Sequence, residues 1–317
     1  MKGEGIATAR ARFTGAATSM IQLQAKYLLL VLLTLGIYHF WGKTAKRKYL
    51  WSRTLLEGEP CEYRGRGLEL CIGFLIALLV VLPVFLAAQL GAGLIQVSPS
   101  LRLVVDIALP SACLLLLREV GRHRALGYLA SRSAWRGVPA LLAGGSWRFA
   151  GASFGYWMLT LVSLGLAYPL LRERQRQMVL NNLWLGSQPL EYQGELRNLY
   201  PRYLLAWLLL APSAGLSLIW YRACEYRYTA ERCRLGGLGF ALHLSGFDLL
   251  WLRISNLVLV LLTLGLAATW ARGRTIALFC QRLELSGRLE GADIVALEPR
   301  PGHHGEGLAA VLGVAAN

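Results

Sequence analysis

Basic side chains are the groups in this sequence best suited to chemistry, and the chemistry they suit is the binding of phosphate. Of the 33 basic residues, only five are lysines. An arginine guanidinium forms two parallel hydrogen bonds with a phosphate, whereas a lysine ammonium acts as a point charge. We predict phosphate contacts at Lys43, Lys46, Arg47, Lys48, Arg118, Arg122, Arg124, Arg172, Arg174, Arg176, Arg272 and Arg274.

A second candidate is a pair of opposite charges inside an apolar stretch. Arg102 and Asp106 stand four residues apart, so on a helix they share one face and form an ion pair. Charged groups are costly in hydrocarbon and tend to face a bundle interior. The spacing therefore predicts an intramembrane pair, with an interfacial pair at the outer end of a span as the alternative.

Catalytic motifs are not found in the chain. It has no G-x-S-x-G, H-E-x-x-H, Walker or dinucleotide-binding pattern, and the five histidines are scattered or lie in the tail. The six cysteines include no C-x-x-C pair, which is typical of small core residues. We predict no enzymatic activity, no cofactor and no metal site.

Long apolar runs dominate the chain, which is 55% hydrophobic with a mean hydropathy of +0.45. About 20 helical residues cross the roughly 30 Å of hydrocarbon in a bilayer. The clearest candidate spans are residues 27–41, 68–94, 101–117, 153–171, 203–221 and 249–271. They predict a polytopic α-helical membrane protein, multi-pass in the bacterial inner membrane, with no cleavable export signal.

The same pattern identifies the expected partner of the basic clusters. The net charge is +15, and the basic residues alternate with the apolar runs. Positive charge in that position orients spans and meets anionic lipid headgroups. We therefore predict that the phosphates belong to lipids of the bilayer, and we exclude nucleic acid.

Internal repeats are the clearest feature of organisation. The tetrapeptide Leu33-Thr34-Leu35-Gly36 recurs nearly unchanged at residues 162–165 and 262–265, each time ahead of a basic cluster. Pro60, Glu62, Tyr63 and Gly65 recur after a shift of 129 residues, and a second match holds at a shift of 100. A fixed register over about fifty residues indicates internal duplication.

Short polar stretches after the basic clusters have strand character. Gly and polar residues between short alternating runs, as in 56–65 and 185–194, predict β-hairpins. Strands with open edges cannot lie in hydrocarbon, so these short β-hairpin or strand elements are expected at the membrane surface. If they share one side, they pair into a small sheet under the helices.

The two shifts differ by 29 residues, which is about one helix and a loop. The difference falls between residues 68 and 117, where the first unit has two apolar runs and the second has only 203–221. Two alternatives keep matching motifs on the same side. Either residues 203–221 dip into the membrane and return, or one segment of 68–117 does not fully cross.

The domain prediction follows from these repeats. Residues 1–297 form a single membrane domain with repeat units at about 10–117, 118–217 and 218–297. Residues 298–317 form a flexible tail.

Motifs in order along the chain resemble the YjgN-like family of bacterial inner-membrane proteins, a family of unknown function. Its opening is matched by Phe13-Thr14-Gly15, residues 32–38, Trp41 and Lys46-Arg47-Lys48-Tyr49. Later signatures are matched by Trp135-Arg136-Gly137, Asp248-Leu249-Leu250-Trp251 and Trp270-Ala271-Arg272. The similarity covers about residues 10–297 and departs from the family in its compact second unit. It implies multi-pass membrane residence and no catalytic residues.

Two functions remain open from the sequence. Repeat-built membrane proteins are frequently transporters, which favours transport or handling of a small solute, ion or lipid. The alternative is a non-transporting scaffold or lipid-responsive interaction protein with a cytoplasmic β-subdomain. Arg clusters at each junction between strand and helix favour the alternative, although ordinary anchoring of spans by positive charge explains them as well.

Overall fold

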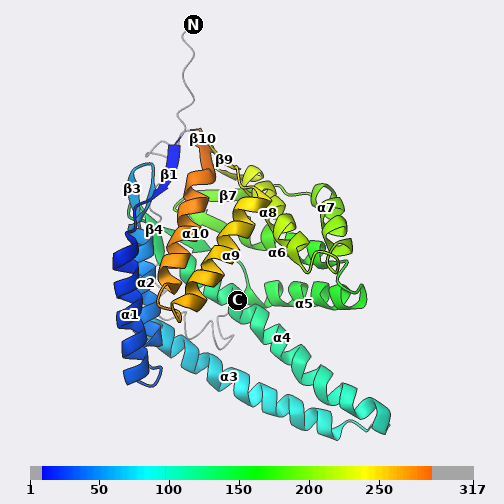
Figure 1. The fold of residues 1–317 in the computed structure, drawn as a ribbon. Helices are drawn as coiled ribbons and strands as arrows, with labels where there is room; N and C mark the ends of the chain where they lie inside the picture. The colour runs from blue at the N-terminus through cyan, green and yellow to red at the C-terminus, as the bar shows by residue number, and fades with distance from the viewer. Residues whose placement is uncertain (1–8, 97, 288–317) are drawn as a thin grey trace.

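Ten short strands close into one barrel in a computed structural model that describes residues 9–96 and 98–287 (Figure 1). Every neighbouring pair is antiparallel, and the order around the barrel is β1-β10-β9-β8-β7-β6-β5-β4-β3-β2. The strands are β1 (Ala9–Phe13), β2 (Thr54–Leu56), β3 (Glu59–Tyr63), β4 (Ser133–Trp135), β5 (Val138–Leu142), β6 (Leu183–Leu185), β7 (Gln188–Tyr192), β8 (Cys233–Leu235), β9 (Leu238–Leu242) and β10 (Leu283–Ser286).

Helical hairpins connect the strands in pairs and extend away from the barrel (Figure 1). The first helices of the hairpins are α1 (Ala17–Leu33), α3 (Gly67–Leu94), α5 (Ser146–Val162), α7 (Leu196–Leu208) and α9 (Gly246–Leu262). The second helices are α2 (His39–Ser52), α4 (Pro99–Ser131), α6 (Tyr168–Leu180), α8 (Leu216–Glu231) and α10 (Ala268–Arg282).

The repeating unit is therefore strand, helix, helix, strand, and the described residues contain five copies of it. Two-residue turns join the copies, as at Glu57-Gly58 and Arg136-Gly137, where both residues have positive φ. Such turns match the twist of antiparallel strands. The sequence shifts of 129 and 100 residues each correspond to a step of two units. The predicted tail, residues 298–317, lies outside the described residues.

The Leu-Thr-Leu-Gly motif forms the turn at the tip of a hairpin. Leu35 and Gly36 adopt left-handed conformations, with φ of 49° and 95°, and reverse the chain between α1 and α2. Thr34 fixes the turn, because its hydroxyl donates to the Leu30 carbonyl at 2.6 Å and accepts from the Tyr38 amide at 3.0 Å. Ser163, Ser213 and Thr263 make equivalent bonds at the tips of three other hairpins.

The prediction of a polytopic α-helical membrane protein with small surface β elements is wrong. Four of the six expected spans (27–41, 153–171, 203–221 and 249–271) contain a chain reversal, so each is a hairpin tip. Among the described residues, only α3 is long and apolar enough to cross a membrane. The strands form one closed barrel that carries all five hairpins. Hydropathy records which residues are apolar but not where the chain turns.

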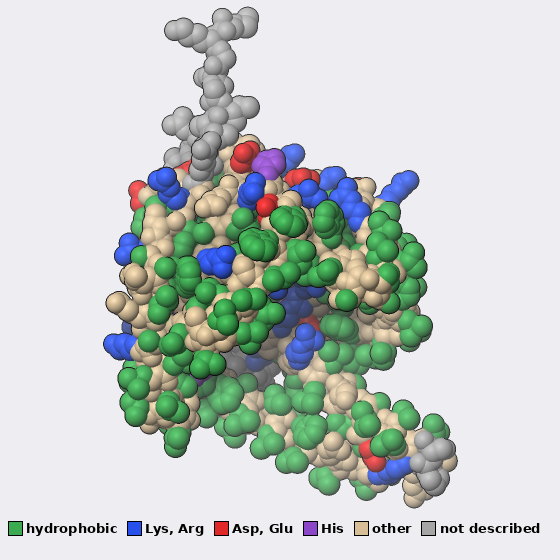
Figure 2. Space-filling view, viewed as in Figure 1, with side chains coloured by type: hydrophobic (Ala, Val, Ile, Leu, Met, Phe, Trp, Pro, Cys, Tyr) green, Lys and Arg blue, Asp and Glu red, His purple; other side chains and the backbone are tan. Residues whose placement is uncertain are grey.

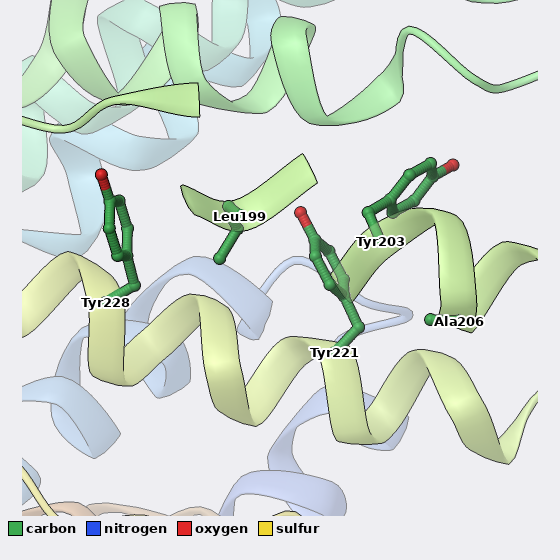
Figure 3. Close-up of a cluster of buried hydrophobic side chains, with 5 residues drawn as sticks. All are labelled: Leu199, Tyr203, Ala206, Tyr221 and Tyr228. Atoms are coloured by element: carbon green, nitrogen blue, oxygen red, sulfur yellow. The ribbon is translucent and has the colours of Figure 1, made fainter. Parts of the chain in front are cut away.

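The α3–α4 hairpin is a long arm that projects from the rest of the molecule (Figure 1). It is 29 residues longer than α7–α8, which accounts for the difference between the two sequence shifts. The chain reverses within residues 203–221, because Ala214 and Gly215 take positive φ angles between α7 and α8. Figure 3 shows how α7 packs on α8, with Leu199 and Tyr203 facing Tyr221 and Tyr228 in a buried cluster.

The recurring Tyr-x-Gly tripeptide ties barrel to helix. Tyr192 is buried at the end of β7, and its hydroxyl donates to the Glu173 carboxylate of α6 at 2.9 Å. A methyl group on Gly194 would overlap both Glu173 Oε1 and the Tyr192 hydroxyl. The tripeptide therefore needs glycine at its third position to admit this hydrogen bond.

Gly194→Ala is expected to destabilise the fold by about 1–3 kcal/mol, the usual effect of overpacking. The matched control is Gly155→Ala in α5, where a methyl group meets no atom within 4 Å. Alanine in a helix interior is favoured over glycine, so this control gains about 0.5–1 kcal/mol. Chemical denaturation monitored by circular dichroism measures both. Equal stabilities would contradict the packing explanation.

Candidate functional site

Five basic side chains occupy the same position in the five units. Each stands on the second helix of its hairpin, eleven residues before the strand that follows. We call this set the basic ring: Lys43, Arg122, Arg172, Arg222 and Arg272. The predicted phosphate contacts include four of the five but not Arg222. The structure places all five at equivalent sites around one circle of helices.

Electrostatic contacts run between ring neighbours. Burial lowers the pKa of Lys43, and the charges of Arg47 and Arg272 lower it further. Burial is also the largest influence lowering the pKa of Arg122, to which Arg172 contributes. Figure 2 shows a hollow between the body of the molecule and the α3–α4 arm, with Lys and Arg side chains in its wall.

Buried carboxylates neutralise one sector of the ring, formed by α4, α6 and α8. Glu225, 3% exposed, lies 2.6 Å from Arg222, 2.9 Å from Arg176 and 3.6 Å from Arg172. Burial acts to lower the pKa of Arg222, but the Glu225 carboxylate outweighs it and raises that pKa. This sector is therefore an ion-pair network around Glu225, in which Arg172 Nε lies at ion-pair distance without a hydrogen bond.

Glu119 completes the neutral sector on α4. Its side chain is fully buried and lies 3.3 Å from Arg122. It also accepts hydrogen bonds from Trp157 Nε1 and Gln175 Nε2. Sequence reasoning missed Glu119, Glu173 and Glu225. The available signal was their spacing. Glu119 and Glu173 each stand three residues from a predicted arginine, and Glu225 stands three residues from Arg222, which the prediction omitted.

The other sector, formed by α2 and α10, has no such compensation. Across residues 9–96 and 98–287, no carboxylate lies within ion-pair distance of Lys43, Lys46 or Arg272. Lys46 is 8% exposed. Its ammonium lies 3.2 Å from the centre of the Tyr27 ring and 3.4 Å from Gln24 Oε1. Burial, with the charges of Arg272 and Lys43, lowers its pKa to about 8.

This lowered pKa predicts a pH dependence of stability. The ordinary pKa of a lysine side chain is 10.5, so between about pH 8 and 10.5 the unfolded chain binds more protons at Lys46 than the folded protein does. The contribution of Lys46 to stability therefore rises with pH across that window. Lys46→Met should be more stable than wild type at neutral pH, and its advantage should shrink as pH rises. Urea denaturation from pH 7 to 10.5 checks this; parallel profiles would contradict it.

Several predicted phosphate contacts already bind protein groups. Arg47 donates to the Tyr63 hydroxyl at 3.1 Å. Arg118 lies 3.3 Å from Glu119, and Arg174 donates to Gln177 at 3.2 Å. Arg274 donates to Asn256 at 3.0 Å. These side chains lie outside the basic ring.

Three predicted positions remain. Arg176 is largely buried in the neutral sector, where it binds Glu225 and donates to Thr229 at 2.7 Å. Arg124 is half-buried on α4, whereas Lys48 is exposed on α2. The structure thus divides the predicted set into ring members, side chains that bind other protein groups, the buried Lys46 and one outward-facing lysine.

Arg102 and Asp106 form the predicted contact, with 3.1 Å between Arg102 Nε and Asp106 Oδ2. Arg102 also donates to the carbonyls of Gly93 and Ile95 at 3.2 and 3.1 Å, which closes the end of α3. The pair therefore holds the far end of the arm together. Its location within a membrane stays a prediction.

Within the described part of the chain, no three His, Cys, Asp or Glu residues are placed to hold a metal ion. The expectation that the protein is not an enzyme stays a prediction.

Comparison with known proteins gave one match. The family model described as "Bacterial protein of unknown function (DUF898)" matches residues 8–218 and 208–311. Searches of curated proteins and of solved structures returned no match.

Proposed function

Because this chain belongs to the DUF898 family of bacterial proteins, whose description names no activity, we propose a function from its geometry: it inserts its hairpin tips into one leaflet of a membrane and gathers anionic phospholipids behind them. The family match confirms the resemblance to YjgN-like proteins. Nothing in the description of the family assigns transport, whereas the hairpin tips and the basic ring both suit contact with lipid.

The observation that carries the proposal is an exposed leucine in a strained conformation at three tips. Leu35, Leu164 and Leu264 have φ of 49–50° and are 95%, 81% and 90% exposed. A left-handed leucine costs about 1–2 kcal/mol that glycine avoids. A large apolar side chain held outward at this cost suits contact with an apolar partner. The last residue of the preceding helix at each of these tips, Leu33, Val162 or Leu262, is apolar and exposed as well.

Lipid is the partner that fits these tips. Hydrocarbon excludes backbone groups that lack hydrogen bonds. At the α1–α2 tip, the Gly36 amide donates to the Val31 carbonyl at 2.8 Å, and Thr34 satisfies two further backbone groups. The Gly165 and Gly265 amides make the same bond to Thr160 and Val260. These backbone groups therefore have hydrogen-bond partners within the turn, as insertion into hydrocarbon requires.

The basic ring lies at a depth that matches lipid phosphates. Its members Lys43, Arg172, Arg222 and Arg272 each follow the glycine of a tip by seven residues. At 1.5 Å per helical residue, the ring stands about 10 Å behind the tips. Interfacial helices bury their apolar groups about 5–10 Å into a leaflet, which leaves the ring among the headgroups. The net charge of +15 favours an anionic, cytoplasmic leaflet.

Transport of a solute is less well supported by this geometry. A transport path must cross the whole bilayer, and α3 is the sole described helix with the length and composition to do so. Lipid handling at the surface uses features that the fold repeats, namely the leucine at three tips and the basic side chain in five units, whereas a transport path would use one helix.

Vesicle flotation of the full-length protein tests the proposal. We expect binding to neutral phosphatidylcholine vesicles that persists in high salt, because apolar insertion is not screened. Adding phosphatidylglycerol should increase binding at low salt, since the Debye length there is longer. Complete release from both kinds of vesicle by high salt would contradict insertion and leave only surface attraction.

A further inference from the structure

We propose that the seam between α2 and α10 is a binding site for a phosphate monoester, held by Lys43, Lys46 and Arg272. The inference deepens the proposed function by naming one site in the basic ring and the chemical class of its ligand. It is carried by an imbalance of charge between the two sectors of the ring.

The equivalent position in another repeat unit can be compared directly with this seam. Arg222 and Arg272 occupy equivalent positions on α8 and α10. Arg222 binds Glu225 at 2.6 Å and the Tyr168 hydroxyl at 2.6 Å. At the position of Glu225, α10 has Thr275 and α2 has Lys46. The seam thus gains a cation where the neutral sector has an anion.

Lys46 is the strongest indication of a missing counter-charge. A lysine with nine-tenths of its surface buried is normally paired. Among the described residues, its ammonium contacts an amide oxygen and the face of an aromatic ring and forms no ion pair. Gln24 is held in place by Thr269, whose hydroxyl donates to the same Oε1 at 2.6 Å. The surroundings fix the ammonium near Lys43 and Arg272, both of which lower its pKa through repulsion.

The number of positive charges in the seam favours a ligand with two negative charges over one with a single negative charge. Lys43, Lys46 and Arg272 are close enough to repel one another, and no carboxylate of the described residues pairs with them, so one negative charge leaves the seam strongly positive. A phosphate monoester carries about two negative charges near neutral pH and offers three acceptor oxygens. A diester headgroup carries one. The seam therefore favours a monoester, supplied either by phosphatidic acid or by a free phosphate.

The experiment compares variants of the full-length protein in an uncharged detergent. The thermal unfolding midpoint is recorded as inorganic phosphate is added at constant ionic strength. Wild type should be stabilised, and Lys46→Met should bind phosphate at least about tenfold more weakly, the effect of losing a charged hydrogen bond. Lys26→Met, the same change at an exposed lysine of α1, should match wild type. Arg272→Gln, at an exposed position, gives a second reading if Lys46→Met folds poorly.

A second arm separates the two sources of phosphate. Flotation with phosphatidylcholine vesicles containing either phosphatidic acid or phosphatidylglycerol should show a preference for phosphatidic acid that Lys46→Met removes. If inorganic phosphate binds without that preference, the ligand is a free phosphate. Phosphate affinity equal to wild type in both Lys46→Met and Arg272→Gln would overturn the site. Failure of all vesicle binding with intact phosphate binding would instead overturn the proposed function alone.

Discussion

Glu225→Gln is expected to destabilise the protein by about 3 kcal/mol, among the largest effects of any single substitution in this fold. The change keeps the shape of the side chain but removes the one carboxylate that Arg172, Arg176 and Arg222 share. Removing one partner from a buried ion pair costs about 3–5 kcal/mol, and we take the lower end because Arg172 and Arg222 keep part of their surface in solvent.

Chemical denaturation measures this effect, and Glu231→Gln is the matched control. Glu231 stands at the end of the same helix and is exposed, so its neutralisation should change stability by no more than about 0.5 kcal/mol. If the two variants were equally stable, the carboxylate would not be neutralising the α4–α6–α8 sector. The contrast between the two sectors of the basic ring would then lose its basis.

The triple variant Leu35→Gly, Leu164→Gly, Leu264→Gly should bind vesicles about a thousandfold more weakly than wild type. Burial of each leucine contributes about 1.5–3 kcal/mol, so the three together contribute about 5 kcal/mol or more. Tenfold in affinity corresponds to about 1.4 kcal/mol. The same changes relieve three left-handed leucines, so the folded protein should be as stable as wild type or more stable.

Flotation and thermal unfolding separate these two effects in one set of samples. Ala214→Gly is the control, because Ala214 takes φ of 47° at the tip between α7 and α8 but carries only a methyl group. It relieves the same backbone strain and should leave vesicle binding nearly unchanged. A triple variant that unfolds more readily, or that floats like wild type, would show that the leucines serve the fold and not the membrane.

Part of this architecture is readable from the sequence. The repeated Pro-x-Glu-Tyr-x-Gly pattern locates strands β3 and β7, and its shift of 129 residues records a step of two units. The predicted basic clusters include four of the five ring members and omit Arg222. Turn chemistry and periodicity are local signals, so they remain visible without knowledge of tertiary contacts.

The remaining features depend on backbone conformation and on contacts between distant residues, which the local sequence pattern does not reveal. Leu35 looks like part of an apolar span, but its left-handed backbone makes it the outermost point of a hairpin. The closed barrel requires β1 to pair with β10, about 270 residues away, and no local pattern predicts that pairing. Glu225 resembles a surface residue until α6 brings Arg172 and Arg176 beside it.

The depth of Leu264 in a bilayer tests the central claim most directly. A fluorescent amino acid placed at position 264, and in a separate sample at position 57 in the turn between β2 and β3, is exposed to vesicles whose lipids carry bromine on the acyl chains. We predict strong quenching at position 264 and little at position 57. Equal, slight quenching at both positions, with position 264 open to aqueous iodide, would contradict insertion of the tips.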